Sequence, residues 1–538
     1  MTPCAQEFSR DSRWKYCCKK GACPQCGQGV EQRQRYCGAG GKSLSVRVEN
    51  SEIQSQAHRF ARALDDAGVG RRASVAVLLP NVPEFVYCLR GATWSGRTFT
   101  PVNWHLSADD IAYVVGNCEP SALVIHADFS EQAEALAANV SPNARFAVGG
   151  TIPGFRSFDE VATFSGDDLD KPLAGTLMLY TSGTTGKPKG VKTDVPDDGP
   201  PPCLASRMGS AMLSAYLPDD TEGIHLVVAP LYHAGPSTYS EGAALLGSDV
   251  IIMEQWDPEE FLRIVESERV TSTFMVPTHF VRLLQLPEET RSKYDTRSLK
   301  LVTHGAAPVS PDVKRRMIEW LGPVLFEFYG GTEGGGVSID SYTWLAHPGS
   351  VGRPRPGLVI HILDEAGQPL PAGEAGDVYF ANDGGRFEYK DDPEKTASAY
   401  RGDLYTLGDI GYLDDEGFLY LRDRKADTII TGGVNVYPAQ IESVLLEHPS
   451  VRDCCVVGLL DEEWGERVLA VIEPHDQNAS QDPIREALKA LCLKRLGSQQ
   501  RPREYVFATS LPRTETGKLP HRKVRDVYRA RALENHGA

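Results

Sequence analysis

The sequence lacks a run of about 18 consecutive apolar residues, and its first twenty residues are polar and charged where a signal peptide has an apolar segment. We therefore expect no membrane span and a cytoplasmic location. Positive charge is also in deficit, because 56 Lys and Arg stand against 72 Asp and Glu, for a net charge of −16. A surface of that sign repels a phosphate backbone, which argues against a nucleic-acid partner.

Cysteine is scarce in the body of the chain. Six of the 12 cysteines precede residue 40, and the others lie singly or in apolar runs, so we expect no disulfide framework. In the leader, Cys23-Pro-Gln-Cys26 has the two-residue gap of a zinc knuckle, which Cys17 or Cys18 with Cys37 could complete. The second pair lacks that gap and no histidine is near, so we expect no zinc and a disordered leader over residues 1–45.

Strands and helices alternate from about residue 52. With 538 residues and 41% hydrophobic content, the chain can build a large core and more than one domain. The alternation predicts a layered α/β body with mixed, largely parallel sheets. The expected strands are Ser74–Leu79, Phe99–Val102, Ala122–His126, Leu226–Ala229, Val250–Met253, Thr271–Val276, Leu301–His304 and Leu325–Tyr329. The expected helices include His58–Ala67, Pro83–Trp94, Asp257–Val270 and Ser310–Leu321.

The last hundred residues have a different pattern of predicted helices and strands. Helices at Pro438–Glu447 and Ile484–Leu496 and strands at Cys455–Leu459 and Val468–Ile472 predict a separate, small α+β unit. A basic tail follows from Leu511 to Arg525. No internal repeat is visible.

A polar loop, Tyr180-Thr-Ser-Gly-Thr-Thr-Gly-Lys-Pro-Lys-Gly190, has the composition of a polyphosphate site. Its glycines let the backbone approach an anion, while its hydroxyls and two lysines add donors and charge. The Walker spacing is absent, because Pro188 follows Lys187 where a P-loop has Ser or Thr. Composition alone is also compatible with an ordinary surface loop. The acidic, proline-rich stretch at 194–202 that follows is predicted to be a surface loop.

This loop resembles, residue for residue, the phosphate-binding loop of the adenylate-forming superfamily, which includes acyl-CoA synthetases, nonribosomal-peptide adenylation domains and luciferases. The resemblance runs from about residue 52 to 525. It implies that phosphates of ATP are bound by Thr181, Ser182, Gly183, Thr184, Thr185, Gly186 and Lys189.

The segment Phe328-Tyr-Gly-Gly-Thr-Glu333 resembles a second signature of this superfamily. There the tyrosine, here Tyr329, stacks on adenine, Thr332 contacts the α-phosphate and Glu333 holds magnesium. Magnesium prefers hard oxygen ligands shared with phosphates, which suits a carboxylate. Without the resemblance, Thr332-Glu333 would be typical of a helix start with an acidic first turn.

Further motifs complete the nucleotide site and the hinge that the resemblance implies. The segment Gly305-Ala306-Ala307 lines adenine in related enzymes, although it also suits a tight strand-to-helix turn. Asp409 and Arg424 contact ribose. Residues 423–427 form the hinge between a large N-terminal domain, 46–422, and a small mobile C-terminal domain, 428–538. Anchoring the motif on Arg424 places the pivot at Ala426, to within one residue.

The acyl and thiol sites rest on the resemblance as well. His233 is expected beside the acyl pocket and the CoA tunnel, where Gly432 and Gly433 also lie. The acyl pocket is expected to include Tyr232, Val276, Gly330 and Gly331. We expect a bulky acyl group, because glycines crowd the loop around Gly330 and leave volume where side chains could stand.

Lys518, in a motif matching the superfamily's C-terminal loop, is expected to enter the site for the first half-reaction. The prediction is an ATP-dependent acyl-CoA synthetase that uses magnesium and CoA and forms an acyl-adenylate from a fatty, aromatic or steroid acid. The catalytic residues would be Lys518, Glu333, Thr332 and His233. Two alternatives remain open: an enzyme that loads a carrier-protein phosphopantetheine, and a non-catalytic nucleotide- or acyl-binding protein. The sequence leaves open whether the protein is a homodimer.

Overall fold

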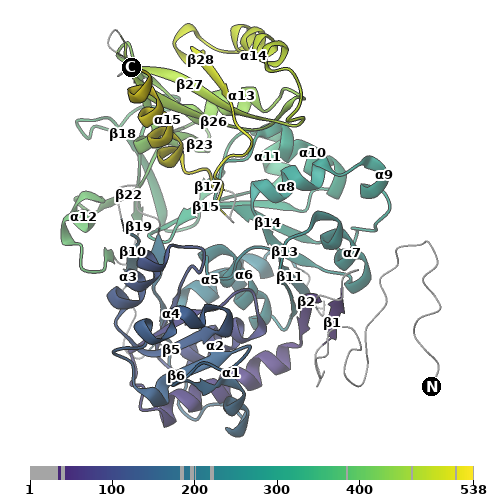
Figure 1. Ribbon diagram of the computed structural model, residues 1–538, viewed down its shortest axis with the longest axis vertical. Helices are drawn as coiled ribbons and strands as arrows, with labels where there is room; N and C mark the ends of the chain where they lie inside the picture. The colour runs from purple at the N-terminus through teal and green to yellow at the C-terminus, as the bar shows by residue number, and fades with distance from the viewer. Residues whose placement is uncertain are drawn as a thin grey trace. The chain divides into compact units, whose positions relative to one another are not determined.

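The computed structural model describes residues 34–37, 43–181, 187–193, 199, 201–217, 223–382, 386–461, 464–514 and 518–536. They form two compact units, whose elements are labelled in Figure 1. Unit 1 consists of the described residues within Met1–Leu177, Val195–Phe274 and Lys293–Lys300, and unit 2 of those within Met178–Asp194, Met275–Ser292 and Leu301–Ala538. Among the described residues, no helix combines the length and the apolar character needed to cross a membrane.

Unit 1 contains a six-stranded parallel sheet in the order β7-β6-β5-β3-β4-β8. All five residues of β3 are buried, as expected for a parallel strand covered on both faces. The strands are β3 (Ser74–Leu78), β4 (Thr98–Pro101), β5 (Pro120–His126), β6 (Arg145–Val148), β7 (Arg156–Ser157) and β8 (Thr176–Leu177). The helices that accompany them are α1 (Asn50–Asp66), α2 (Pro83–Trp94), α3 (Ala108–Cys118) and α4 (Ser130–Leu136).

The helix ends of this part follow local chemistry. The hydroxyl of Ser107 accepts a hydrogen bond from the Asp110 amide at 3.2 Å, which is the N-cap expected for α3. The helix α1 begins at Asn50, eight residues before the predicted start at His58. Its extra turns bury Ile53 and Ala57, so packing of the amphipathic face, more than propensity, sets its length.

Unit 1 also holds the strands β1-β2-β12-β11-β13. The pairs β11–β12 and β11–β13 are parallel, whereas β2 pairs antiparallel with β12 and with β1. The strands are β1 (Gln34–Cys37), β2 (Ser43–Val48), β11 (Ile224–Val227), β12 (Asp249–Met253) and β13 (Ser272–Met275), and the helices are α5 (Leu204–Ser214), α6 (Ala234–Leu245) and α7 (Pro258–Glu268).

The leader expected to be disordered over residues 1–45 therefore includes strand residues, because β1 and the start of β2 lie within it and pair with each other. Pairing offers β1 backbone hydrogen bonds that do not require the apolar side chains the leader lacks. Of the cysteines considered for zinc, Cys17, Cys18, Cys23 and Cys26 lie outside the described residues.

Unit 2 begins with the parallel pair β14–β15, to which β16 and β17 add antiparallel. Two further sheets are antiparallel: β20-β10-β9, and β18-β19-β22-β21 with β23 on β22. The strands are β9 (Leu179–Thr181), β10 (Lys189–Thr193), β14 (Leu301–Gly305), β15 (Leu325–Gly331), β16 (Gly334–Asp340), β17 (Arg353–Pro354), β18 (Leu358–Leu363), β19 (Gly376–Asn382), β20 (Phe387–Tyr389), β21 (Tyr400–Arg401), β22 (Leu404–Leu413) and β23 (Leu419–Arg424). The helices are α8 (Pro277–Gln285), α9 (Glu288–Arg291), α10 (Pro311–Leu321), α11 (Ser341–Ala346) and α12 (Pro393–Ser398).

The C-terminal part of unit 2 is an α+β sandwich around β25-β24-β27-β26, with β28 paired to β27. Its elements are β24 (Ile429–Thr431), β25 (Val434–Val436), α13 (Pro438–Leu445), β26 (Val451–Asp461), β27 (Gly465–Pro474), α14 (Gln481–Arg495), β28 (Glu504–Phe507) and α15 (His521–His536).

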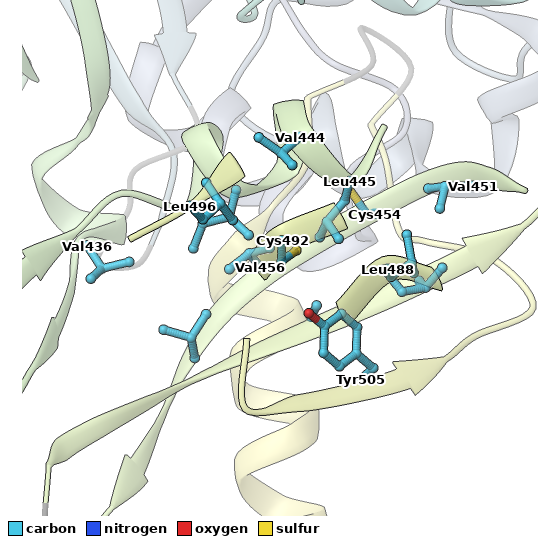
Figure 2. Close-up of a cluster of buried hydrophobic side chains, with 14 of the residues drawn as sticks. Val436, Val444, Leu445, Val451, Cys454, Val456, Leu488, Cys492, Leu496 and Tyr505 are labelled. Atoms are coloured by element: carbon cyan, nitrogen blue, oxygen red, sulfur yellow. The ribbon is translucent and has the colours of Figure 1, made fainter. Parts of the chain in front are cut away.

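Alternation along β26 sends side chains to both faces of this sheet. Cys454 and Val456 pack with α13 and α14 in the cluster of Figure 2, while Cys455 and Val457 pack on the other face against Val524 of α15. Each fully buried large apolar side chain contributes about 1.5–3 kcal/mol. The predicted α/β class with parallel sheets is confirmed.

Candidate active site

The two residues Thr332 and Glu333 form the turn of an antiparallel hairpin. Gly331 of β15 pairs with Gly334 of β16, so only Thr332 and Glu333 join the strands. The helix start that these residues would suggest on their own is therefore not formed. The turn presents the Thr332 hydroxyl and the Glu333 carboxylate side by side in the chain at the end of β15.

The glycines of this hairpin serve backbone geometry. Gly334 has φ of 142°, and a Cβ there would lie 2.5 Å from the Tyr405 hydroxyl. A Cβ on Gly330 would lie 2.9 Å from Phe328 Cζ, and one on Gly331 would lie 2.9 Å from Glu333 Oε2. The space beside these glycines is thus filled by protein atoms. Packing of the hairpin thus accounts for these glycines, so they do not support the expectation of a bulky acyl group, which stays a prediction.

Tyr329, Asp409 and Arg424 form one hydrogen-bonded group. The Tyr329 hydroxyl donates to Asp409 Oδ2 at 2.6 Å, and Arg424 Nε lies 2.9 Å from Asp409 Oδ1. Asp409 and Arg424 are register partners on β22 and β23, which places them side by side. Burial raises the pKa of Asp409, and Arg424 and Tyr329 oppose that rise. Both carboxylate oxygens are thus directed at donors, the bidentate geometry that paired hydroxyls of a ribose would use.

Glu333 lies beside a second aromatic residue. The Tyr389 hydroxyl donates to Glu333 Oε1 at 2.9 Å. Lys189 Nζ lies 5.7 Å from the centre of the Tyr389 ring and 3.0 Å from Asp392 Oδ2. Burial and the Glu333 charge raise the pKa of Tyr389, so it remains a neutral donor. Lysine and carboxylate are therefore held next to each other through one tyrosine.

The side chain of Lys518 belongs to the same electrostatic environment. Loss of hydration and the Arg424 charge lower its pKa, while the carboxylates of Glu333 and Asp409 raise it. Although the residue as a whole remains exposed, its ammonium therefore interacts with charges from β22, β23 and the β15–β16 turn. The charges of Arg424, Glu333 and Asp409, all from predicted motifs, therefore act on the Lys518 ammonium.

The phosphate loop connects β9 and β10, whose residues pair in register Thr181↔Lys189. Thr181 and Lys189 lie at the two ends of this connection. Gly190 is required locally, because a Cβ there would lie 2.9 Å from Tyr180 Cζ. The predicted phosphate ligands between them, Ser182, Gly183, Thr184, Thr185 and Gly186, lie outside the described residues.

The predicted adenine segment follows β14. A Cβ on Gly305 would lie 2.3 Å from the Phe328 carbonyl oxygen of the neighbouring strand, so only glycine fits there. Ala306 has φ of 68°, in the left-handed region that non-glycine residues rarely adopt. Backbone strain of this kind, followed by Ala307, gives a tight strand-to-loop turn made of small side chains.

Gly432 and Gly433 form a two-residue hairpin turn between β24 and β25, because Thr431 pairs with Val434. Their φ values are 57° and 76°, which favour glycine at both positions. A Cβ on Gly432 would also lie 2.8 Å from Trp464 Cε3. The sequence analysis placed these glycines at the CoA tunnel and did not predict this turn.

The remaining predicted residues are placed as follows. Val276 is buried in unit 2, where it precedes α8. Tyr232 and His233 belong to unit 1 and precede α6, with ring centroids 4.4 Å apart. His105 Nδ1 lies 3.1 Å from the Tyr232 hydroxyl, an interaction that the sequence did not indicate.

Three functional candidates were missed: Tyr389, Asp392 and Tyr405. They reach the site through pairing of β20 with β10 and through the Gly335 amide, which donates to the Tyr405 hydroxyl at 2.9 Å. Each is distant in sequence from the motifs it joins. Their only sequence signal is the aromatic alternation of Phe387 and Tyr389, which does not identify a partner.

The expected hinge, residues 423–427, lies within unit 2, and its last three residues form a short 3-10 turn, Lys425–Asp427. Lys425 Nζ lies 2.7 Å from Asp377 Oδ2. Asp423 Oδ2 accepts a hydrogen bond from the Ala439 amide at 3.0 Å, in the first turn of α13. Polar contacts therefore tie both flanks of this segment to the neighbouring strands and helix.

Comparison with known proteins agrees with this geometry. The model of the AMP-binding enzyme family matches residues 44–385, and that of the AMP-binding enzyme C-terminal domain matches residues 440–518. The chain therefore belongs to the AMP-binding enzymes, within the ATP-dependent adenylate-forming superfamily.

Individual relatives differ in the acceptors that their names give. The chain is 31% identical over 516 residues to the medium/long-chain-fatty-acid–CoA ligase FadD8 of Mycobacterium tuberculosis, covering 91% of this chain and 87% of that protein. It is 29% identical to the fatty acid–[acyl-carrier-protein] ligase ScoC of Streptomyces coeruleorubidus, covering 89% and 91%. The amide bond synthetase McbA from Marinactinospora thermotolerans superposes with a TM-score of 0.76 at 28% identity, covering 91% and 96%.

Proposed function

We propose that this protein is an ATP-dependent carboxylic acid–CoA ligase that forms an acyl-adenylate and releases AMP and pyrophosphate. The observation that carries the proposal is the hydrogen-bonded group of Tyr329, Asp409 and Arg424 beside the Glu333 carboxylate that Tyr389 holds. The charges of Arg424, Glu333 and Asp409 also act on Lys518. An ammonium, a guanidinium and two carboxylates at one place suit a reaction in which phosphate charge is redistributed. A protein that only bound nucleotide would have no need of the lysine.

In the first half-reaction, a carboxylate oxygen of the acid attacks the α-phosphorus of ATP, and the bond to pyrophosphate breaks. Lys518 and the Thr332 hydroxyl stabilise the charge on the α-phosphoryl oxygens. Lys189, together with Thr181, retains the leaving pyrophosphate. The product is the mixed anhydride between the acid and AMP.

The nucleoside is held by the Tyr329 group. Asp409 accepts hydrogen bonds from the ribose hydroxyls, and Arg424 keeps that carboxylate ionised. The Tyr329 ring stacks on adenine and is fixed by the hydrogen bond from its hydroxyl to Asp409. The side chains of Gly305–Ala307 are small, so the backbone of this segment can contact the adenine. Positioning of the nucleotide thus depends on rigid strands.

Magnesium fits the residues present, because Glu333 supplies one hard carboxylate and this metal takes one or two such ligands together with substrate phosphates. When bound, it would neutralise phosphate charge. Tyr389 holds Glu333 by one oxygen, which orients the carboxylate before the nucleotide arrives.

In the second half-reaction, rotation about residues 423–427 exchanges Lys518 for the turn at Gly432–Gly433. The CoA thiol then attacks the acyl carbonyl, the C–S bond forms, and AMP leaves with the electrons of the C–O bond. The left-handed glycine turn supports this exchange, since it gives a backbone surface without side chains.

The acid is proposed to be fatty or aromatic, and this rests on the relatives and not on the hairpin glycines. FadD8 supports a fatty acid and CoA, while ScoC supports a carrier-protein phosphopantetheine as an alternative acceptor. Both acceptors present the same thiol arm, so the site alone does not separate them.

The test is pyrophosphate release from ATP with a panel of fatty, aromatic and steroid acids, alone, with CoA and with a phosphopantetheinylated carrier protein. We expect a single-turnover burst without acceptor and continuous turnover with CoA. Turnover with the carrier protein alone would replace the CoA assignment. Absence of any acid-dependent burst would refute the adenylation chemistry.

A further inference from the structure

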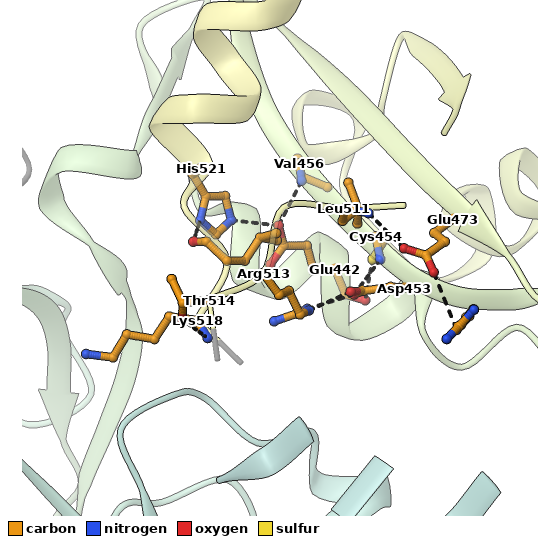
Figure 3. A network of polar contacts seen from close by, with 12 residues as sticks. Glu442, Asp453, Cys454, Val456, Glu473, Leu511, Arg513, Thr514, Lys518 and His521 are labelled. Atoms are coloured by element: carbon orange, nitrogen blue, oxygen red, sulfur yellow. Dashed lines mark hydrogen bonds and ion pairs between the residues drawn. The ribbon is translucent and has the colours of Figure 1, made fainter. Parts of the chain in front are cut away.

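The Lys518 segment is fastened at its base by reciprocal hydrogen bonds, shown in Figure 3. The Thr514 amide donates to the Lys518 carbonyl at 2.9 Å, and the Lys518 amide donates to the Thr514 hydroxyl at 3.0 Å. Thr514 and Lys518 thereby hold the two stems of the loop together. The position of Lys518 therefore depends on the contacts that attach these two stems to the sheet.

His521 fixes the second stem. Its backbone amide donates to the Leu519 carbonyl at 3.0 Å, and its Nδ1 lies 3.2 Å from the same oxygen. Its Nε2 lies 2.7 Å from Glu442 Oε1. A carbonyl and a carboxylate can only accept, so both ring nitrogens must donate, which a neutral imidazole with one N–H cannot do. The contacts of His521 are satisfied only by the imidazolium form.

Glu442 is a firm support for this charge. It lies on α13, and its Oε1 also accepts from the Val456 amide of β26 at 2.7 Å. One carboxylate thus joins α13, β26 and the first residue of α15. The pair is largely shielded, with side-chain exposures of 15% for His521 and 14% for Glu442, so water screens it little.

The other charged and titratable groups around His521 favour the same form. Asp427 lies 3.9 Å from Nδ1, and Asp423 adds negative charge from the end of β23. Cys455 of β26 faces the pair as a neutral thiol, since burial raises its pKa well above the usual value. Burial lowers the pKa of His521, but Glu442, Asp427 and Asp423 outweigh that effect and raise it to about 9.

The first stem is held independently. Arg513 donates from Nε and Nη2 to the two oxygens of Asp453 at 2.5 and 2.7 Å, and the Leu511 amide donates to Glu473 Oε2 at 2.8 Å. The Arg513–Asp453 pair is bidentate, and the two acceptors Asp453 and Glu473 lie on β26 and β27. The two stems therefore rest on one sheet, but only the second rests on a residue whose charge is lost as the pH rises through about 9.

We propose that His521, as an imidazolium, is a positioning residue for Lys518. It bridges the Leu519 carbonyl and the Glu442 carboxylate through its two ring N–H groups and so fixes the stem that carries Lys518. This role rests on the proposed function, in which Lys518 serves the adenylation step alone. Since a misplacement of about 1 Å can cost roughly 10²-fold in rate, loosening of this stem should appear in that step.

The first experiment separates the two half-reactions in His521→Gln, His521→Lys and the control His475→Gln, which changes an exposed histidine directly after β27. We expect His521→Gln to lower kcat for acid-dependent pyrophosphate–ATP exchange about tenfold. The KM for ATP and thioester formation from supplied acyl-adenylate should stay within about twofold, because the lysine acts in one transition state only. His521→Lys should restore most of the exchange rate, and the control should match wild type.

Equal loss of both half-reactions in His521→Gln, or no rescue by His521→Lys, would overturn the positioning role. Wild type and Lys518→Ala are run beside them: absence of acid-dependent exchange in wild type would refute the proposed function, retention of adenylation by Lys518→Ala would refute the role of Lys518 and this inference with it, and abolition of adenylation by Lys518→Ala with His521→Gln unaffected would refute this inference alone. Should His521→Gln not fold, Glu442→Gln carries the same comparison, with the same expected split.

The second experiment needs no activity. Ring ¹⁵N shifts of the protein are recorded from pH 6 to 10, with His521→Lys used to assign the resonances. We expect both ring nitrogens of His521 to be protonated at pH 7.5 and to titrate at about 9. A neutral His521 ring at pH 7.5 would overturn the proposal.

Discussion

Two groups of charged residues in unit 2 differ in the exposed fraction of their side chains. In the nucleotide group, Asp409 is buried but Arg424 keeps 53% of its side chain exposed, and Lys518 is exposed as well. In the loop-anchoring network, His521, Glu442, Arg513 and Asp453 have side-chain exposures of 15, 14, 29 and 16%. The carboxylates of both groups receive donors from the protein, so the groups differ in the exposure of their charged side chains and not in whether they are paired.

This difference in exposure indicates which group binds substrate and which group holds the loop in place. A charged side chain that stays exposed to solvent can exchange its protein partner for a phosphate or a ribose. Separating a charged pair that is shielded from solvent costs free energy. The first group is therefore suited to bind substrate, and the second to hold the residue that acts on it. The following predictions test this division.

The largest effect is expected from Lys518→Ala. Loss of the ammonium should slow acyl-adenylate formation by about 10³-fold, the range seen when a transition-state charge partner is removed. Thioester formation from supplied acyl-adenylate should change little. Single-turnover assays of both steps check this, and equal loss in both would contradict a role limited to adenylation.

A smaller loss is expected from Glu333→Gln in the same group. The neutral amide is a weaker ligand for magnesium, so the magnesium concentration for half-maximal adenylation should rise, with a rate loss of about 10–10²-fold at fixed magnesium. Binding of the acid should be retained. A magnesium titration of pyrophosphate exchange measures this, and an unchanged midpoint would remove Glu333 from the metal site.

Ala426→Pro tests the segment that joins the two groups. Proline would fix φ near about −65° and restrict Lys425, which narrows the torsions available to the hinge. The contacts Lys425–Asp377 and Asp423–Ala439 hold the orientation seen here. Acyl-adenylate should therefore accumulate while thioester formation falls about tenfold.

The matched variants for this hinge prediction are Lys425→Pro and Asp427→Pro, assayed for both products in a single turnover. If one of these blocks thioester formation and Ala426→Pro does not, the pivot lies one residue away. If none has an effect, alternation of the C-terminal part is not the basis of the second step.

The smallest effect concerns stability and pH. The pKa of His521 is raised in the folded protein to about 9 from 6.5, so its stabilising pair is fully present below about pH 6.5 and is lost as pH rises through 9. The difference in the free energy of unfolding between wild type and His521→Gln, measured by denaturant titration, should therefore shrink between pH 6.5 and 9.5 by an amount on the order of 1–3 kcal/mol. A constant difference would show that the pair carries no charge-dependent stability.

Much of the fold could be read from local patterns. The helix Pro83–Trp94 was predicted because 3.6-residue periodicity is a property of residues that are close in the sequence. The C-terminal strands were predicted at the right place but too short, since β26 runs from Val451 to Asp461. Strand length depends on a partner, here β27, which the periodicity of one segment does not reveal.

The sequence by itself determined the order of chemical groups along the chain: Lys189, Glu333, Asp409, Arg424 and Lys518 stand in motifs whose composition limits what they can bind. It also determined where glycine is needed, as at Gly432 and Gly433. These are consequences of side-chain chemistry and of allowed backbone torsions, which hold wherever the segment lies.

Only the tertiary structure decided which groups meet. The Tyr389–Glu333 and Tyr329–Asp409 hydrogen bonds join residues 56 and 80 positions apart, and His521 meets Glu442 across 79 positions. Pairing of strands distant in sequence and packing of α15 on β26 create these contacts. The charge of His521 follows from the two acceptors that this packing places around one ring, because hydrogen-bonding demand acts through space and not along the chain.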